Sequence, residues 1–249
     1  MKRCVVAAVA AFLFAGGSAL AADLPAKAPY YKAPVGYYNW GGCYIGGHGG
    51  GGWANFENGV IRNQNFAQNF GDFATGEGFD HNGSGWVAGG HIGCNYQSGQ
   101  FVFGIEGAYS GANIKGDFLD RTVGAGDDQF TQKVSGIGSV VGRLGIANNN
   151  WLFYAKGGWA IAKSRFSVVD VGAPITGSGN VSNWHNGWTV GGGVEVGFFG
   201  NWIAGVEANF YRFESKTYEL GNPAGALAYT WDAGPRDVTT VLGRLSYKY

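Results

Sequence analysis

Eight ionisable side chains recur along the chain at positions where a metal site or an ion-conducting gate could be built. The set contains two histidines, three carboxylates and three cations: His48, His91, Glu106, Arg143, Lys156, Glu195, Glu207 and Arg244. Two imidazoles and one carboxylate would match the three protein ligands of a catalytic zinc site. Three carboxylates beside three cations could instead form a network of ion pairs, either a fixed polar core or a gate that rearranges to pass ions.

Three further short motifs could carry chemistry, but each has a simpler interpretation. The segment His81-Asn82-Gly83-Ser84 holds a histidine and a serine without an acid to orient them. The pair Asp127-Asp128 could contact Ca²⁺ weakly, and Trp184-His185 could hold a flat ligand such as haem. The glycine runs match no phosphate-binding pattern. We therefore interpret the first two motifs as solvated loop residues, and Trp184-His185 as residues at a membrane interface.

The eight ionisable residues all lie on the more polar face of an alternating segment. The last segment, Val238–Tyr249, is the clearest example, because its odd-numbered positions are mostly apolar and its even-numbered positions more polar. A period of two residues indicates a β-strand with two different environments. Such a strand at the end of a chain would be an exposed edge, unless it closes a barrel.

Seven similar segments precede it, which makes eight predicted strands. Their bounds are Trp40–Ala54, Gly85–Tyr96, Phe101–Ser110, Val134–Ala147, Trp151–Ala162, Trp188–Phe198, Trp202–Phe213 and Val238–Tyr249. Short turns alternate with long loops, the latter predicted at Asn55–Ser84, Gly111–Lys133, Lys163–Gly187 and Glu214–Asp237. This is the pattern of an outer-membrane barrel. The sequence therefore predicts an all-β fold, an eight-stranded antiparallel transmembrane β-barrel with four long external loops and short periplasmic turns.

The predicted barrel assigns an environment to the charges and the aromatic residues. A charge facing lipid at the bilayer midplane would cost about 2–4 kcal/mol, so we expect all six charged residues of the set to face inward. Aromatic residues at strand ends would form the girdles: Trp40, Trp53, Trp86, Trp151, Trp188, Trp202 and Tyr249. An eight-stranded interior is just wide enough for side chains to fill. The sequence thus favours a structural polar core over a gate, and disfavours a metal site.

The amino-terminal region predicts export. Residues 1–21 read as a signal peptide with cleavage after Ala21 or Ala22, residues 22–39 as an extended periplasmic lead-in, and residues 40–249 as the barrel. Cys43 and Cys94 would remain in an oxidising compartment. We expect His48 opposite His91, which would place Cys43 opposite Tyr96 and leave the cysteines diagonal. A slip of two residues would set them opposite each other, so a disulfide stays an open alternative.

Composition excludes several other classes of protein. The formal net charge is zero and 14% of residues are charged, with no basic stripe that would suit nucleic acid. There are 47 glycines, 9 tryptophans, 13 tyrosines and 17 phenylalanines, an unusual content of glycine and aromatic residues. After the signal peptide no run of apolar residues is long enough for a transmembrane helix.

Motifs along the strands resemble a known family. They read AADLPAKAP, GCYIGGHGGGGW, GWVAGGHIGCNYQ, FGIEG, VGRLGIA, LFYAKGGWA, GWTVGGGVEVGF, NWIAGVEANF and LGRLSYKY. In this order they resemble the outer-membrane immunogenic proteins of Gram-negative bacteria, a porin-like branch of the OmpA-type barrels. The resemblance implies a surface-exposed envelope protein and antigen. Some relatives are credited with haem binding or weak pore activity, but no motif for either carries over to residues here. The final Tyr249 stands where the family often has Phe.

These observations together predict a location, a function and partners. We expect a non-enzymatic structural and surface-antigen protein of the cell outer membrane, without a cofactor and with a largely plugged polar lumen. The alternative is a narrow porin or a haem-binding surface receptor. Expected partners are outer-membrane lipid, lipopolysaccharide and the barrel assembly machinery, which would recognise the strand that ends at Tyr249. The ligands of the loops stay open.

Overall fold

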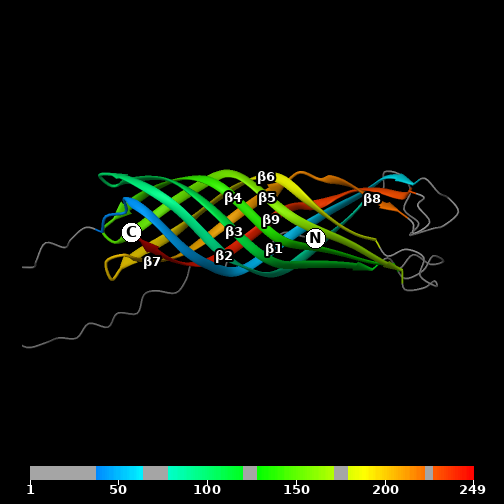
Figure 1. Ribbon diagram of the computed structural model, residues 1–249, viewed down its shortest axis with the longest axis horizontal. Helices are drawn as coiled ribbons and strands as arrows, with labels where there is room; N and C mark the ends of the chain where they lie inside the picture. Colours follow the sequence, from blue (N-terminus) through cyan, green and yellow to red (C-terminus); the bar gives the residue numbers. More distant parts are fainter. Residues whose placement is uncertain (1–37, 64–77, 120–127, 171–178, 222–226) are drawn as a thin grey trace, which may run out of the picture. The chain divides into compact units, whose positions relative to one another are not determined.

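Nine β-strands account for nearly all of the described chain (Figure 1). The computed structural model describes residues 38–63, 78–119, 128–170, 179–221 and 227–249, so the predicted signal peptide and most of the lead-in lie outside the described residues. The strands are β1 (Gly42–Asn63), β2 (Gly78–Ser98), β3 (Phe101–Leu119), β4 (Asp128–Asn148), β5 (Trp151–Asp170), β6 (Gly179–Phe198), β7 (Trp202–Phe213), β8 (Lys216–Gly221) and β9 (Leu227–Lys248). No helix in these ranges is long and apolar enough to cross a membrane.

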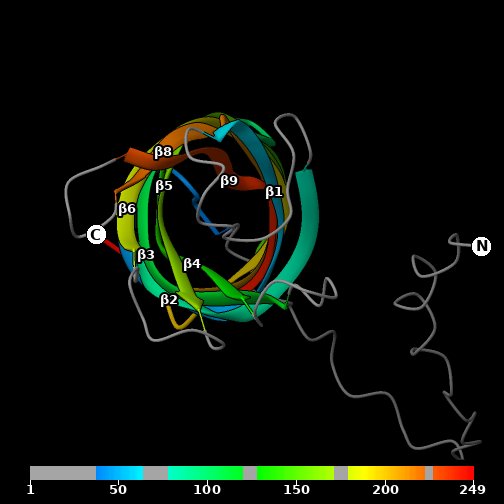
Figure 2. The same ribbon diagram turned by 90° about the vertical axis from the view of Figure 1, so that its right-hand side faces the viewer.

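The strands form one closed antiparallel barrel, as the view along its axis shows (Figure 2). Neighbours in the sheet are neighbours in sequence, and β9 completes the ring by pairing with both β7 and β1. The short strand β8 continues the course of β7 and also pairs with β9, so the ring has eight strands around it. The predicted eight-stranded barrel, closed by the carboxyl-terminal strand, is confirmed.

The strands run much further than the sequence predicted, and the predicted long loops are correspondingly too long. Residues 55–63, 111–119 and 163–170 belong to strands rather than to loops. In these stretches the outward positions are polar, which hides the alternation, while the inward positions hold buried residues such as Phe56, Ile114 and Phe166. The inward residues make these polar stretches continuations of the barrel wall.

The predicted register of the first hairpin is wrong by two residues. His48 lies opposite Gly89 and Gly46 lies opposite His91. This shift sets Cys43 directly opposite Cys94, and the two cysteines form a disulfide. A side chain at position 46 would not fit there, because an added Cβ would lie 2.6 Å from Nε2 of His91. The same shift pairs Trp53 with Ser84 instead of Trp86.

The outer surface carries an apolar band between two rings of aromatic residues. One ring, nearer the long connections, includes Trp53, Trp86, Trp159 and Trp188. The other, nearer the short turns, includes Tyr96, Phe101, Trp151, Trp202 and Tyr247. Trp40 was predicted to join a ring but is fully buried inside the barrel, because it precedes the first strand and folds across the mouth.

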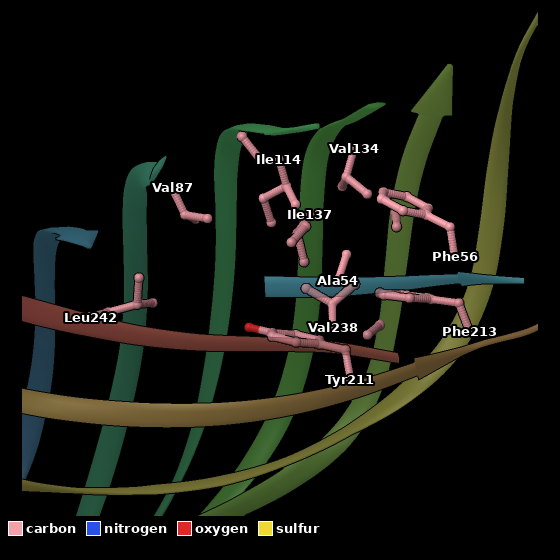
Figure 3. Close-up of a cluster of buried hydrophobic side chains, with 13 residues drawn as sticks. Ala54, Phe56, Val87, Ile114, Val134, Ile137, Tyr211, Phe213, Val238 and Leu242 are labelled. Carbon is pink, nitrogen blue, oxygen red and sulfur yellow. The ribbon is translucent and has the colours of Figure 1, made fainter. Parts of the chain in front are cut away.

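Two apolar clusters fill the inside of the barrel at different levels. Trp40, Val102, Leu152, Tyr154 and Ile203 pack together near the short turns, with Tyr38 against them. A larger cluster lies toward the long connections, and in Figure 3 its side chains reach inward from strands all round the wall. Its members are Ala54, Phe56, Val87, Ala112, Ile114, Val134, Ile137, Ala160, Ala162, Tyr211, Phe213, Val238 and Leu242. Between the clusters lies the layer of ionisable residues.

Candidate functional site

The structure brings the six charged residues of the predicted set together in the middle of the lumen. Each comes from a different strand, and each is at most 8% exposed. In ring order they are Glu106 on β3, Arg143 on β4, Lys156 on β5, Glu195 on β6, Glu207 on β7 and Arg244 on β9. Alternation along each strand turns these side chains inward, and the short turns hold most of them at a similar level.

Glu106 is the centre of this charge layer. Its carboxylate lies 3.3 Å from Nη1 of Arg143, 3.2 Å from Nζ of Lys156 and 2.5 Å from Nη2 of Arg244. All three cations of the layer therefore meet at one carboxylate. Removal of Glu106 would leave three buried cations with only two carboxylates, and an unbalanced buried charge is costly.

The remaining two carboxylates complete the pairing of each cation. Glu195 accepts from Nη2 of Arg143 at 2.7 Å, and Nε of Arg244 lies 3.6 Å from it. Glu207 accepts from Nζ of Lys156 at 2.7 Å and also pairs with Nη1 of Arg244. Every cation thus contacts at least two carboxylates, and the layer is neutral by formal charge. Such a network joins six strands through their inward-facing side chains.

Two tyrosines that were not among the predicted site residues join the layer. The hydroxyl of Tyr44 donates to Glu106 at 2.7 Å and accepts from Nη1 of Arg143 at 2.5 Å. The hydroxyl of Tyr154 donates to Glu207 at 2.6 Å, and the guanidinium of Arg143 lies 4.0 Å from the centre of its ring. The sequence could have indicated them, because each lies on the same face of its strand as an ionisable residue. Tyr154, for example, lies two residues before Lys156.

The histidines form a separate pair at the edge of the charge layer. The rings of His48 and His91 stack with centroids 5.4 Å apart, and their Nδ1 atoms are 3.1 Å apart. Nε2 of His48 lies 2.7 Å from Oγ of Ser110, and Nε2 of His91 lies 2.7 Å from Oγ of Ser246. All four ring nitrogens are therefore engaged in hydrogen bonds, so a metal ion would have to displace these partners.

The other sequence motifs do not assemble into sites. His81 is buried inside the barrel, where it stacks on Phe56, and Ser84 is exposed on the outside of the same strand. Trp184 is 44% exposed whereas His185 is fully buried, so the two point to opposite faces and cannot hold one flat ligand together. Asp127 lies outside the described residues.

The space left in the charge layer is very small. A cavity of about 10 Å³ lies among the histidines, the charged residues and apolar neighbours such as Ile137 and Leu242. This is at the lower limit of what one water molecule occupies. The arrangement offers an interlocked set of ion pairs and no room for a substrate.

Sequence comparison agrees with the barrel. The profile of the family described as outer membrane protein beta-barrel domain matches residues 7–235. A 22 kDa outer membrane protein of Rhizobium leguminosarum bv. viciae is 28% identical over 77% of this chain and 72% of its own length. A 25 kDa outer-membrane immunogenic protein of Brucella canis is 28% identical over 88% of both chains.

A third relative reaches a slightly higher identity. The 31 kDa outer-membrane immunogenic protein of Brucella melitensis is 31% identical over 81% of this chain and 83% of its own length. The profile match covers most of the chain and includes five of the six strands of the charge layer in full, but it ends in β9 before Arg244. The chain therefore belongs to the outer membrane protein beta-barrel domain family, and its barrel is an outer-membrane protein.

Proposed function

We propose that this protein is a non-enzymatic structural barrel of the outer membrane, whose external end serves as a surface antigen. The observation that carries the proposal is the filling of the lumen along its length. The names of the Brucella relatives, outer-membrane immunogenic proteins, support the role of the external end. The partners that follow are membrane lipid, lipopolysaccharide and the barrel assembly machinery.

Three stacked layers support a barrel that does not conduct. Trp40 and Leu152 are fully buried in the apolar cluster near the short turns, the periplasmic side of such barrels. The charge layer follows, with its void of about 10 Å³. The larger apolar cluster, including Ile114 and Phe56 at zero exposure, comes next. Ions would have to cross two layers of closely packed apolar side chains as well as a network of paired charges.

This arrangement weakens the porin alternative in a specific way. From the charge pattern alone, removal of Arg244 could open a water path by deleting bulk and freeing Glu207. The apolar layers on both sides of Arg244 would still block that path, because they are built from other residues. A haem receptor has equally little support, since Trp184 and His185 face opposite sides of the wall.

The carboxyl-terminal strand suits recognition by the barrel assembly machinery. It is the closing strand, paired with β1 on one side and β7 on the other. Tyr249 follows it and is 70% exposed, which leaves its aromatic side chain free to contact a partner. Tyr249→Ala should reduce assembly in cells more than it reduces refolding in detergent.

Planar-bilayer recording tests the proposed function. The barrel is inserted after its folded state has been verified by the difference in gel migration between unheated and boiled samples. We expect no steady conductance from the wild-type protein, and none from Arg244→Ala protein that still folds. A large, stable channel in the wild type would overturn the proposal. A channel that appears only in Arg244→Ala would show that the apolar layers do not seal the lumen.

A further inference from the structure

A second row of charges lies on the outside of the same wall. Lys115 on β3 is directly opposite Lys133 on β4, and Lys133 is directly opposite Arg165 on β5. Serines flank the row, since Ser84 pairs with Lys115 and Ser182 pairs with Arg165. Directly opposite side chains on neighbouring strands have their Cβ atoms about 5 Å apart. Three positive charges therefore stand side by side on adjacent strands, as the neighbouring positions of β3, β4 and β5 in Figure 1 illustrate.

In the described part of the chain this cation row forms no ion pair, and the nearby outward carboxylate of Asp117 on β3 accepts a hydrogen bond from Thr131 instead. Neither these three residues nor nearby Lys163 form an ion pair with a described carboxylate. Arg165 has a long hydrogen bond of 3.4 Å to Oγ of Ser182, and Nζ of Lys163 lies 5.7 Å from the centre of the Trp184 ring. Like charges directly opposite each other destabilise a sheet. An external anion would remove that cost.

On the opposite side of the barrel, two exposed arginines form ion pairs with carboxylates of this chain. Arg212 on β7 donates from Nε to Asp237 on β9 at 2.8 Å, and Arg236 on β9 donates to Glu57 on β1 at 2.8 Å. These cations are also exposed, yet each has a carboxylate of this chain as its partner. The β3–β5 side therefore differs in carrying three adjacent cations that form no ion pair with a described carboxylate.

The cation row lies beyond the aromatic ring, on the side of the long connections. On the outward face of β5, Lys163 follows Trp159 by four residues and Arg165 follows it by six. A strand that rises about 3.3 Å per residue and tilts by about 40° gains roughly 10 Å over four residues and roughly 15 Å over six. Lysine and arginine stems can reach back from there toward the headgroup region, which extends some 5–8 Å beyond the hydrocarbon core.

We propose that Lys115, Lys133 and Arg165, with Lys163 beside them, form a docking site for the phosphate groups of lipopolysaccharide in the outer leaflet. The proposal rests on the envelope role given above and adds a site and a chemistry to it. The guanidinium of Arg165 can hold a phosphate through two parallel hydrogen bonds, and the lysines add compact positive charges. Phosphates between the strands would replace the repulsion within the row by attraction.

A crossed pair of measurements tests the site. The folded barrel in detergent is titrated with purified lipopolysaccharide, and its thermal unfolding is followed with and without that lipid. The test variant is Lys115→Gln/Lys133→Gln/Arg165→Gln, which keeps long polar stems. The matched control is Arg212→Gln/Arg236→Gln, which removes two exposed cations that are paired within the chain.

The expected results run in opposite directions. Without lipopolysaccharide the triple variant should unfold at the same temperature as the wild type or higher, because the repulsion within the row is gone. Its affinity for lipopolysaccharide should fall about 100-fold, because each of the three cations near an anionic leaflet contributes somewhat less than a factor of about ten to binding. The control variant should bind like the wild type, and Lys115→Arg/Lys133→Arg should retain binding. A folded triple variant with unchanged affinity would overturn the proposal.

Two further arms identify the source of the phosphate. Dephosphorylated lipopolysaccharide should bind the wild type as weakly as intact lipopolysaccharide binds the triple variant, and inorganic phosphate alone should not raise the unfolding temperature. Equal binding of the dephosphorylated lipid would assign recognition to the acyl chains and refute the site. Stabilisation by inorganic phosphate would show a free-anion site instead of a lipid site. None of these results depends on conductance, which tests the proposed function separately.

Discussion

Strands β3, β4 and β5 each carry one charge of the buried layer and one of the outer row, and the two sets behave in opposite ways. The inner residues mix signs, and the outer residues are all positive: Glu106, Arg143 and Lys156 inside, Lys115, Lys133 and Arg165 outside. Inside, every cation contacts at least two carboxylates. Outside, the three cations face one another.

The difference reflects where compensation can come from. In the lumen a charge is cut off from water and salt, so the chain itself must supply the partner, and an unpaired charge is very costly. On the outside, water, salt and anionic lipid can supply the partner of a charge. Pairing two such charges therefore changes the free energy of unfolding only a little. In the lumen, positive and negative residues must therefore occur together. On the outside, a row of positive residues costs little stability and can bind an anion.

The largest expected effect is at Glu106. Glu106→Gln removes the carboxylate shared by all three cations, and we expect a loss of about 3–5 kcal/mol in the free energy of unfolding, or failure to fold. Urea unfolding followed by gel migration of unheated samples measures it. The control is Asp117→Asn, further along β3 on the outside, where Asp117 accepts a hydrogen bond from Thr131. Equal losses in the two variants would contradict the comparison.

The second prediction compares two arginine–carboxylate pairs. Arg143→Met and Glu195→Leu should each be strongly destabilising, while the double variant should lose much less than their sum, because no buried charge is left unpaired. The corresponding cycle on Arg212 and Asp237 outside should show little coupling, and that coupling should vanish in 1 M salt at a screening length of about 3 Å. Additive effects for Arg143 and Glu195 would mean that they do not act as a buried pair.

A smaller effect is expected at Tyr44. Tyr44→Phe deletes the hydroxyl between Glu106 and Arg143 but keeps the ring, so about 1–2 kcal/mol of stability should be lost. Tyr109, on the outside of the barrel and 54% exposed, offers a matched control. Tyr109→Phe should leave the unfolding midpoint unchanged. A midpoint for Tyr44→Phe equal to that of the wild type would show that its hydroxyl is dispensable to the layer.

The smallest effect, and one of opposite sign, is expected at Lys133. Lys133→Gln removes the central cation of the outer row and should raise stability by a few tenths of a kcal/mol at low salt, in the absence of lipopolysaccharide. The gain should disappear in high salt, because screening removes the repulsion in the wild type as well. Lys156→Gln, on the neighbouring strand inside, should destabilise at both salt concentrations. A loss of stability in Lys133→Gln would imply that the row is compensated within the chain.

Register predictions succeeded or failed according to the connection between the strands. Arg143 and Lys156 lie directly opposite each other across the tight turn between β4 and β5. A tight turn fixes the register of its hairpin. The connection between β1 and β2 is long and fixes nothing, so the predicted pairing of His48 with His91 slipped by two residues. A slip of two keeps every side chain on its face, and the predicted inward phases were unaffected.

The sequence alone determined the strand order, the even number of strands and the inward direction of the six charged residues of the buried layer. These properties follow from a local period of two residues and need no knowledge of the neighbouring strands. Tertiary structure decided which charges meet: that Glu106 becomes the centre of three cations, that Trp40 enters the lumen, and that Cys43 reaches Cys94. It also decided the outer row, whose residues lie in segments that the sequence assigned to loops. Such contacts depend on register and closure between strands distant in sequence, which no local pattern encodes.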